Sequence, residues 1–215
     1  MPNPNEQQCE KCKGCGRCCW LGKKKYPDEA QCVTLLDRAG CTKRVIVHCC
    51  TVKTVAEEIG KGFKADMNLV IAGALLHDIG RAKDHTIMHA NAGAEMAERL
   101  NLPEELVSII RKHIGAGLDD EDAYELGVPK GDYIPRTIEE KIVAHADNLV
   151  SDNRIVGHMH TVEKLRSKGS HRGADRVVAL HKELSNMYGK DLDEVASALG
   201  ESPALAGLCA ALARK

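Results

Sequence analysis

The sequence places an adjacent histidine and aspartate, His77 and Asp78, at the end of the apolar run Ala74-Leu75-Leu76. An ionised carboxylate beside apolar neighbours is costly unless a positive charge meets it, and a metal ion would also use the imidazole next door. Because adjacent residues lie about 100° apart around a helix, both reach one ion only where the helix is ending. Gly80 supplies such an ending. For this dipeptide alone, the alternative is a helix C-terminus that merely carries the two residues.

Other side chains of the metal-ligand type occur on the apolar faces of separate predicted helices. His48 falls on the buried stripe of Val45, Val52 and Val55, at spacings of three and four residues. A lone histidine on such a stripe is more often a satisfied core residue. Helical bundles, however, build metal sites from inward side chains on facing helices. The candidate set is His48, His77, Asp78, His89, His113 and Asp147.

The elements that must position these side chains are predicted to be helices. Only 3% of the 215 residues are aromatic, and Ala-rich and Leu-rich segments without β-branched alternation favour helices packed on helices. We therefore expect an all-α fold. The Gly-rich and acidic connection 115–132 is long for a compact domain, which indicates a lid or a substrate-facing loop. Helices are predicted over residues 30–39, 42–59, 65–79, 89–100, 103–114, 122–126, 137–150, 173–188 and 192–199.

Charge and hydropathy exclude some classes of partner. The formal net charge is -1, from 30 basic and 31 acidic residues, so no global field draws the chain to nucleic acid or to an anionic membrane. No apolar run reaches about 18 residues, and no charged-then-apolar leader of the secretory type is present. The sequence therefore predicts a cytoplasmic, soluble protein without a membrane partner.

Five of the ten cysteines lie within residues 9–19. In a reducing compartment such a cluster is more often a metal site than a set of disulfides. One set of four cysteines, separated by two, two and three residues, resembles the cysteine run that binds an iron-sulfur cluster in bacterial ferredoxins. Trp20, however, stands where such runs carry proline. Another choice suits tetrahedral zinc, and a Cys-rich tail without metal is the third alternative. The first choice is Cys9, Cys12, Cys15 and Cys19, and the second replaces Cys19 by Cys18.

The order of the ligand-type residues and the context Leu-Leu-His-Asp-Ile-Gly resemble the HD-domain superfamily of metal-dependent phosphohydrolases over residues 44–150. The resemblance implies that His48, His77, Asp78 and Asp147 hold one metal ion. Some branches add two histidines, and His89 and His113 fall where those lie, so that Asp78 would bridge two ions. His85, one turn earlier, is the alternative match to the position assigned to His89. We prefer His89 because it opens a helix and is followed by small residues.

The resemblance also implies a chemistry. Imidazoles and carboxylates suit one or two divalent ions of Fe, Mn, Co, Ni or Zn, and such ions activate water and neutralise charge on phosphoryl oxygens. His77 and Asp78 would then be catalytic as well as metal ligands. Arg81 and Lys83 are candidates to contact substrate phosphate, the alternative being an ordinary solvated basic turn. Arg44, Arg154, His158 and His160 are weaker candidates.

Together these features predict a Cys-rich metal-binding segment at residues 1–25, an HD domain at 26–150 and a helical extension at 151–215. The expected activity is cleavage of a phosphodiester or phosphoanhydride in a nucleotide or another phosphate ester. Two alternatives stay open at this point. One is a diiron HD-type oxygenase, and the other is a non-enzymatic protein that binds nucleotide or RNA.

Overall fold

The predicted all-α fold is confirmed by the computed structural model, which describes residues 25–200. The predicted cysteine site at Cys9, Cys12, Cys15 and Cys19 lies outside the described residues. Within the described part, no helix is both long enough and apolar enough to cross a membrane. The elements are α2 (Glu29–Ala39), α3 (Lys43–Gly60), α4 (Met67–Leu76), η3 (Ile79–Ala82), α5 (His89–Arg99), α6 (Glu104–Lys112), α7 (Asp120–Glu125), α8 (Ile138–Asn148), β1 (Val150–Ser151), β2 (Arg154–Ile155), α9 (His158–Ser167), α10 (His171–Tyr188) and α11 (Leu192–Ser197).

Side-chain caps set the starts of the helices around the core. The carboxylate of Asp66 accepts from the amides that open α4, and Thr42 caps α3. Thr137 forms a capping box with Glu140 at the start of α8. Each such cap stabilises a helix by about 1 kcal/mol. These caps fix where α3 and α8 begin, and therefore which of their residues face α4.

Helix α4 is the centre of the bundle. Seven of its residues are buried, and it packs against α2, α3, α6 and α8. Burying each of its large aliphatic side chains contributes about 1.5–3 kcal/mol. The helix ends at Leu76, three residues before the predicted end at residue 79. Gly80 is not a left-handed cap, contrary to our expectation, because it lies inside the tight turn η3 with a negative φ.

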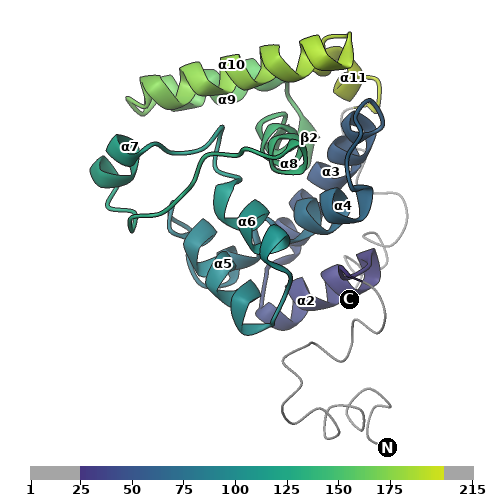
Figure 1. The fold of residues 1–215 in the computed structure, drawn as a ribbon, viewed down its shortest axis with the longest axis vertical. Helices are drawn as coiled ribbons and strands as arrows, with labels where there is room; N and C mark the ends of the chain where they lie inside the picture. The colour runs from purple at the N-terminus through teal and green to yellow at the C-terminus, as the bar shows by residue number, and fades with distance from the viewer. Residues whose placement is uncertain (1–24, 201–215) are drawn as a thin grey trace, which may run out of the picture.

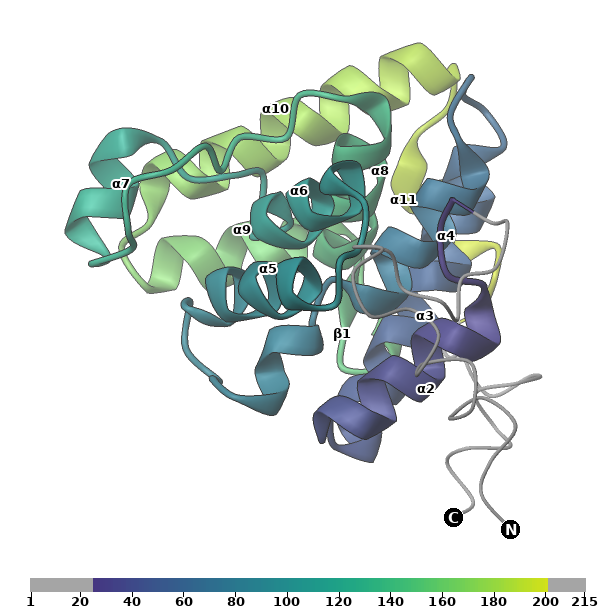
Figure 2. The ribbon, with the colours of Figure 1, turned by 60° about the horizontal axis from the view of Figure 1, so that its bottom comes forward.

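The remaining helices form layers on either side of this centre. In Figure 1, α9 and α10 run along one side of the molecule, α2 lies on the opposite side, and α3, α4, α6 and α8 lie between them. Figure 2 shows α5 and α6 side by side, in agreement with their extensive packing. The antiparallel hairpin of β1 and β2 follows α8 directly, with Asp152 in its turn at a φ of 56°.

The sequence did not predict α9 or the hairpin. Helix α9 begins after Gly157, whose φ is 75°, without a side-chain cap, and Val162 is its one fully buried residue. A helix that lacks both a cap and a broad apolar stripe gives little periodic signal. It is held from outside instead, because Asp193 accepts hydrogen bonds from the backbone amide and the Nδ1 of His158.

The 115–132 connection contains α7, two residues earlier than the predicted short helix. Its residues Ala123 and Val128 pack with Tyr133 in a small cluster apart from the main core. Ion pairs tie it to α10, since Arg176 contacts both Asp119 and Asp122. The connection is therefore anchored at the far end of α10 from α11.

Candidate metal centre

Five elements bring the six predicted ligand side chains to one place. His48 comes from the middle of α3, and Asp147 from the last turn of α8. His77 and Asp78 follow the end of α4. His89 is the first residue of α5, and His113 follows the last residue of α6. Helix ends supply five of the six side chains, and His48 alone comes from the middle of a helix.

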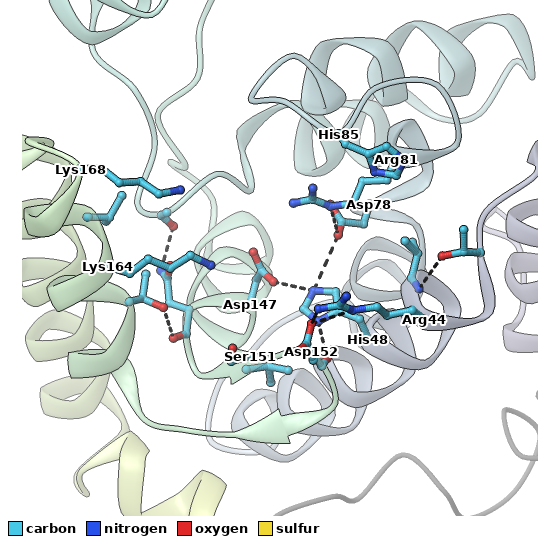
Figure 3. A pocket seen from close by; sticks show the side chains of 17 residues that line it. Arg44, His48, Asp78, Arg81, His85, Asp147, Ser151, Asp152, Lys164 and Lys168 are labelled. Atoms are coloured by element: carbon cyan, nitrogen blue, oxygen red, sulfur yellow. Dashed lines mark hydrogen bonds and ion pairs between the residues drawn. The ribbon is translucent and has the colours of Figure 1, made fainter.

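One group of donor atoms forms around Asp147. Its Oδ1 lies 3.0 Å from Nε2 of His48 and 3.5 Å from Nε2 of His77. The two imidazole nitrogens are 3.3 Å apart. The Oδ2 of Asp78 completes the group at 3.8 Å from His48 and 3.7 Å from His77. Figure 3 shows His48, Asp78 and Asp147 directed toward one another at the base of a pocket.

A second group forms on the other oxygen of Asp78. Its Oδ1 lies 3.1 Å from Nε2 of His89 and 3.5 Å from Nε2 of His113. These two nitrogens are 3.1 Å apart. The carboxylate of Asp78 thus faces one group with each oxygen. His85 is not part of either group, although it lines the adjacent pocket.

Each of the four imidazoles is fixed by a hydrogen bond from its other nitrogen. Nδ1 of His77 lies 2.7 Å from the carbonyl oxygen of Ala74, and the same contact recurs for His48, His89 and His113 with the carbonyls of Asp152, Thr86 and Ile110. Because a carbonyl only accepts, Nδ1 carries the proton and donates it. Nε2 then offers its lone pair to the centre, as in histidines that bind metal ions.

This donor set fits divalent metal ions. The Oδ1 of Asp78 is buried and accepts no hydrogen bond from the described residues. It faces imidazole lone pairs, so electron-rich atoms meet at 3–4 Å in a largely buried site. A cation between them removes that repulsion. Nitrogen and carboxylate donors of this kind suit Mn, Fe, Co, Ni or Zn.

The pKa values of the centre reflect the same crowding. Burial alone would lower the pKa of His77, but the carboxylates of Asp78 and Asp147 outweigh it and raise that pKa to about 9. Burial would likewise raise the pKa of Asp78, yet the charge of His77 and the facing imidazoles hold it well below its usual range. In the absence of an ion, a proton on His77 therefore supplies part of the missing positive charge.

A close contact between backbones positions the second group. An added Cβ on Gly80 would collide with the carbonyl oxygen of His89 and lie 2.5 Å from the amide nitrogen of Gly93. No residue with a side chain fits there without a shift of α5. Gly80 therefore lets η3 approach the first turn of α5, which brings His89 to Asp78.

The pocket beside the centre has a volume of about 580 Å³. Arg81 lies on its wall, and its Nε donates to Oδ2 of Asp78 at 2.5 Å. Arg44 also lines it and is paired with Asp152 at 2.6 Å. Lys83, Arg154 and His160 lie outside this lining, and His158 bonds to Asp193 instead. The opposite wall is completed by residues that the sequence did not single out, namely Thr161 and Lys164 of α9 and Lys168, which follows α9.

His145, on the same helix as Asp147, lies away from the centre. It is fully buried, and its Nε2 is 3.2 Å from Nδ1 of His181. Burial lowers the pKa of His145 to about 3, so it remains neutral. Cys32, Cys41 and Cys49 are buried free thiols.

Comparison with known proteins identifies related chains. The chain is 46% identical over 172 residues to a tRNA (cytidine(56)-2'-O)-methyltransferase of Picrophilus torridus, which covers 80% of this chain and 50% of that protein. An uncharacterized protein of Methanocaldococcus jannaschii is 41% identical over 154 residues, which covers 68% of this chain and 91% of that protein. The chain therefore spans about half the length of the first of these relatives and most of the second.

A solved structure has the same fold. The HD domain of the L. monocytogenes phosphodiesterase PgpH, in complex with cyclic-di-AMP, superposes with a TM-score of 0.53. The match covers 79% of this chain and 96% of that domain at 16% sequence identity. The family model described as HD domain matches residues 45–152, which carry all six ligand-type side chains. The resemblance predicted from the sequence is thereby confirmed, and this chain belongs to the HD domain family.

Proposed function

We propose that this protein is a metal-dependent phosphohydrolase that cleaves a phosphodiester or phosphoanhydride bond of a nucleotide-type substrate. The observation that carries the proposal is the carboxylate of Asp78, which faces a separate set of imidazoles with each oxygen. His48, His77, Asp78 and Asp147 would hold one ion, and Asp78, His89 and His113 a second. Divalent ions bound there would neutralise charge on phosphoryl oxygens and activate water near neutral pH.

The side chains around the centre have separate tasks in this proposal. Backbone carbonyls fix the tautomer of each histidine, so the ligands need no rearrangement when an ion binds. Arg81 orients Asp78 through its Nε, and its guanidinium lies on the pocket wall, where it would contact a phosphoryl oxygen. The pocket of about 580 Å³ has room for a substrate larger than inorganic phosphate.

A nucleotide-type substrate is supported by two relatives. The solved HD domain that shares this fold binds cyclic-di-AMP and belongs to a phosphodiesterase. The relative from Picrophilus torridus is named for its action on tRNA. Both names refer to molecules that contain nucleotides joined by phosphodiester bonds.

The test combines metal analysis with a screen of phosphate esters. Protein purified without air and loaded with Mn, Fe, Co, Ni or Zn should release phosphate or a nucleotide from at least one diester or anhydride. His89→Ala should lose about one bound ion per chain and at least 100-fold in turnover. His85→Ala is the matched control and should keep both ions. Loss of an ion from His85→Ala, with none from His89→Ala, would refute this ligand assignment.

The same screen separates the oxygenase alternative. Turnover that requires O2 and releases no phosphate would overturn the phosphohydrolase proposal and favour a diiron oxygenase. The air-free arm and the aerated arm must therefore use the same protein and the same metal.

A second candidate is a non-catalytic module that binds RNA. The 46% identity to a protein named as a tRNA methyltransferase favours it, since the matched region is half of that relative. It predicts tight binding of a tRNA transcript that survives Asp78→Ala, with no turnover of any ester in any metal. Binding that disappears with Asp78→Ala and turnover in the wild type would exclude it.

A further inference from the structure

Two lysine side chains, Lys164 of α9 and Lys168 directly after its last residue, lie on the pocket wall opposite the candidate metal centre. Lys164 and Lys168 line the same pocket as Arg81 and Asp147. Figure 3 shows both lysines extending from α9 into the space in front of Asp147. Helix α9 lies beyond residue 152, where the match to the HD family model ends. This wall is therefore an addition to the part of the chain that carries the six ligand-type residues.

Contacts next to the centre hold α9 in this position. The hydroxyl of Thr161 donates to the carbonyl oxygen of Asn148 at 2.8 Å, one residue after Asp147. Val162 is fully buried, and α9 packs along α10. Residues three and four apart lie on one face of a helix. Lys164 and Lys168 therefore share the face of Thr161 that looks onto the pocket.

The other pocket cations already have carboxylate partners. Arg44 is paired with Asp152, and Arg81 with Asp78. In contrast, no carboxylate within residues 25–200 forms an ion pair with Lys164 or Lys168. Arg166, on another face of the same helix, is paired with Asp175. The two unpaired positive charges of α9 are thus the ones that face the pocket.

We infer that Lys164 and Lys168 bind a second phosphate of the substrate, separate from the phosphate held at the metal centre. The inference rests on the proposed function. Two ammonium groups one helical turn apart suit a phosphate, which lysine binds as a point charge. The substrate class is then a nucleotide that carries at least two phosphates, such as a short oligonucleotide with a terminal phosphate.

Equilibrium binding tests this inference without requiring turnover. The ligands are two adenosine dinucleotides whose internucleotide bridging oxygen is replaced by methylene, one with a terminal phosphate and one without. Full-length Mn-loaded protein should bind the phosphorylated ligand more tightly. The double variant Lys164→Gln/Lys168→Gln should lower the affinity for the phosphorylated ligand about tenfold at low salt. Its affinity for the ligand without the terminal phosphate should stay within about twofold of the parent protein's. Arg166→Gln removes a positive charge from α9 on a face away from the pocket, and it should change neither affinity.

The outcomes separate this inference from the proposed function. Equal weakening of both ligands would overturn it, because the lysines would then act on the metal centre as a whole. Unchanged binding of the phosphorylated ligand, or no preference for it in the parent protein, would overturn it too. If the selective loss appears but no ester is hydrolysed, the second-phosphate site stands and the proposed hydrolysis fails.

Discussion

Substitution of Gly80 by alanine should disturb the second group of metal ligands while leaving the first in place. Gly80 follows Asp78 by two residues and packs against the first turn of α5, where His89 begins the helix. A methyl group at Gly80 points at the carbonyl oxygen of His89 and at the amide of Gly93. The clash is with backbone, so no side chain can turn aside to relieve it.

The size of the effect follows from that contact. The added Cβ would lie 2.5 Å from the amide nitrogen of Gly93 and nearer still to the carbonyl oxygen of His89, whereas real Cβ atoms stay beyond 3.0 Å, so α5 must move by well over half an ångström. Overpacking of this kind costs about 1–3 kcal/mol of unfolding free energy. Because Nε2 of His89 is 3.1 Å from Asp78, the same shift moves a ligand. We expect the affinity for the second ion to fall about 10- to 100-fold.

Urea unfolding and metal titration measure the two effects separately. Gly60→Ala, at the last residue of α3, is the matched control, since its Cβ meets only the thioether end of Met67 at 2.6 Å, a flexible side chain that can adjust. Its helical position also gains about 0.5–1 kcal/mol from the loss of a glycine. Gly80→Ala with wild-type stability and two tightly bound ions would refute the reasoning. Equal damage from both variants would refute it as well.

Three further predictions concern the centre and its surroundings. Asp78→Asn should lower turnover at least about 100-fold and release both ions with unchanged helix content by circular dichroism, and a variant that keeps a tenth of the activity would contradict this. Burial lowers the pKa of His77, but the carboxylates of Asp78 and Asp147 outweigh burial and raise this pKa from an ordinary value of 6.5 to about 9. In metal-free protein, the attraction between protonated His77 and these carboxylates should therefore stabilise the fold fully below pH 6.5 and be lost as the pH rises through about 9. The Tm should fall over this pH range, and His77→Gln should make the Tm less dependent on pH. Arg176→Gln should lower the unfolding free energy by about 1 kcal/mol because it removes one of the two arginines, with Arg172, that pair with the buried carboxylate of Asp122. The exposed pair of Arg166 and Asp175 should contribute less than about 0.5 kcal/mol by the same urea assay.

The fold and the convergence of the ligand residues could be predicted from the sequence because the signals are local. His48 sits at helical spacing with buried valines, and His89 and His113 lie at the ends of helices that polar or proline residues delimit. The order of these residues along the chain then resembled one family. Their role as ligands remains a prediction, although the structure brings the six side chains together.

What the sequence could not predict depends on contacts between distant residues. Gly80 resembled a helix cap, and its actual role is visible only when α5 packs against η3. Helix α9 has few apolar residues and is held by Asp193 from another helix, so no local pattern marks it. For that reason Lys164 and Lys168 could not be assigned to the pocket before the fold was known.

The hydrogen bonds behind the four histidines are of two kinds. For His77, His89 and His113, the acceptor is the carbonyl three residues earlier, so each ring is aimed by its own turn of backbone. For His48, the acceptor is Asp152, 104 residues further along, in the turn between β1 and β2. Three of the imidazole rings can thus be oriented by local backbone, whereas the ring of His48 is oriented only once the β1–β2 hairpin has formed. Completion of the first ligand group is therefore tied to the formation of the β1–β2 hairpin.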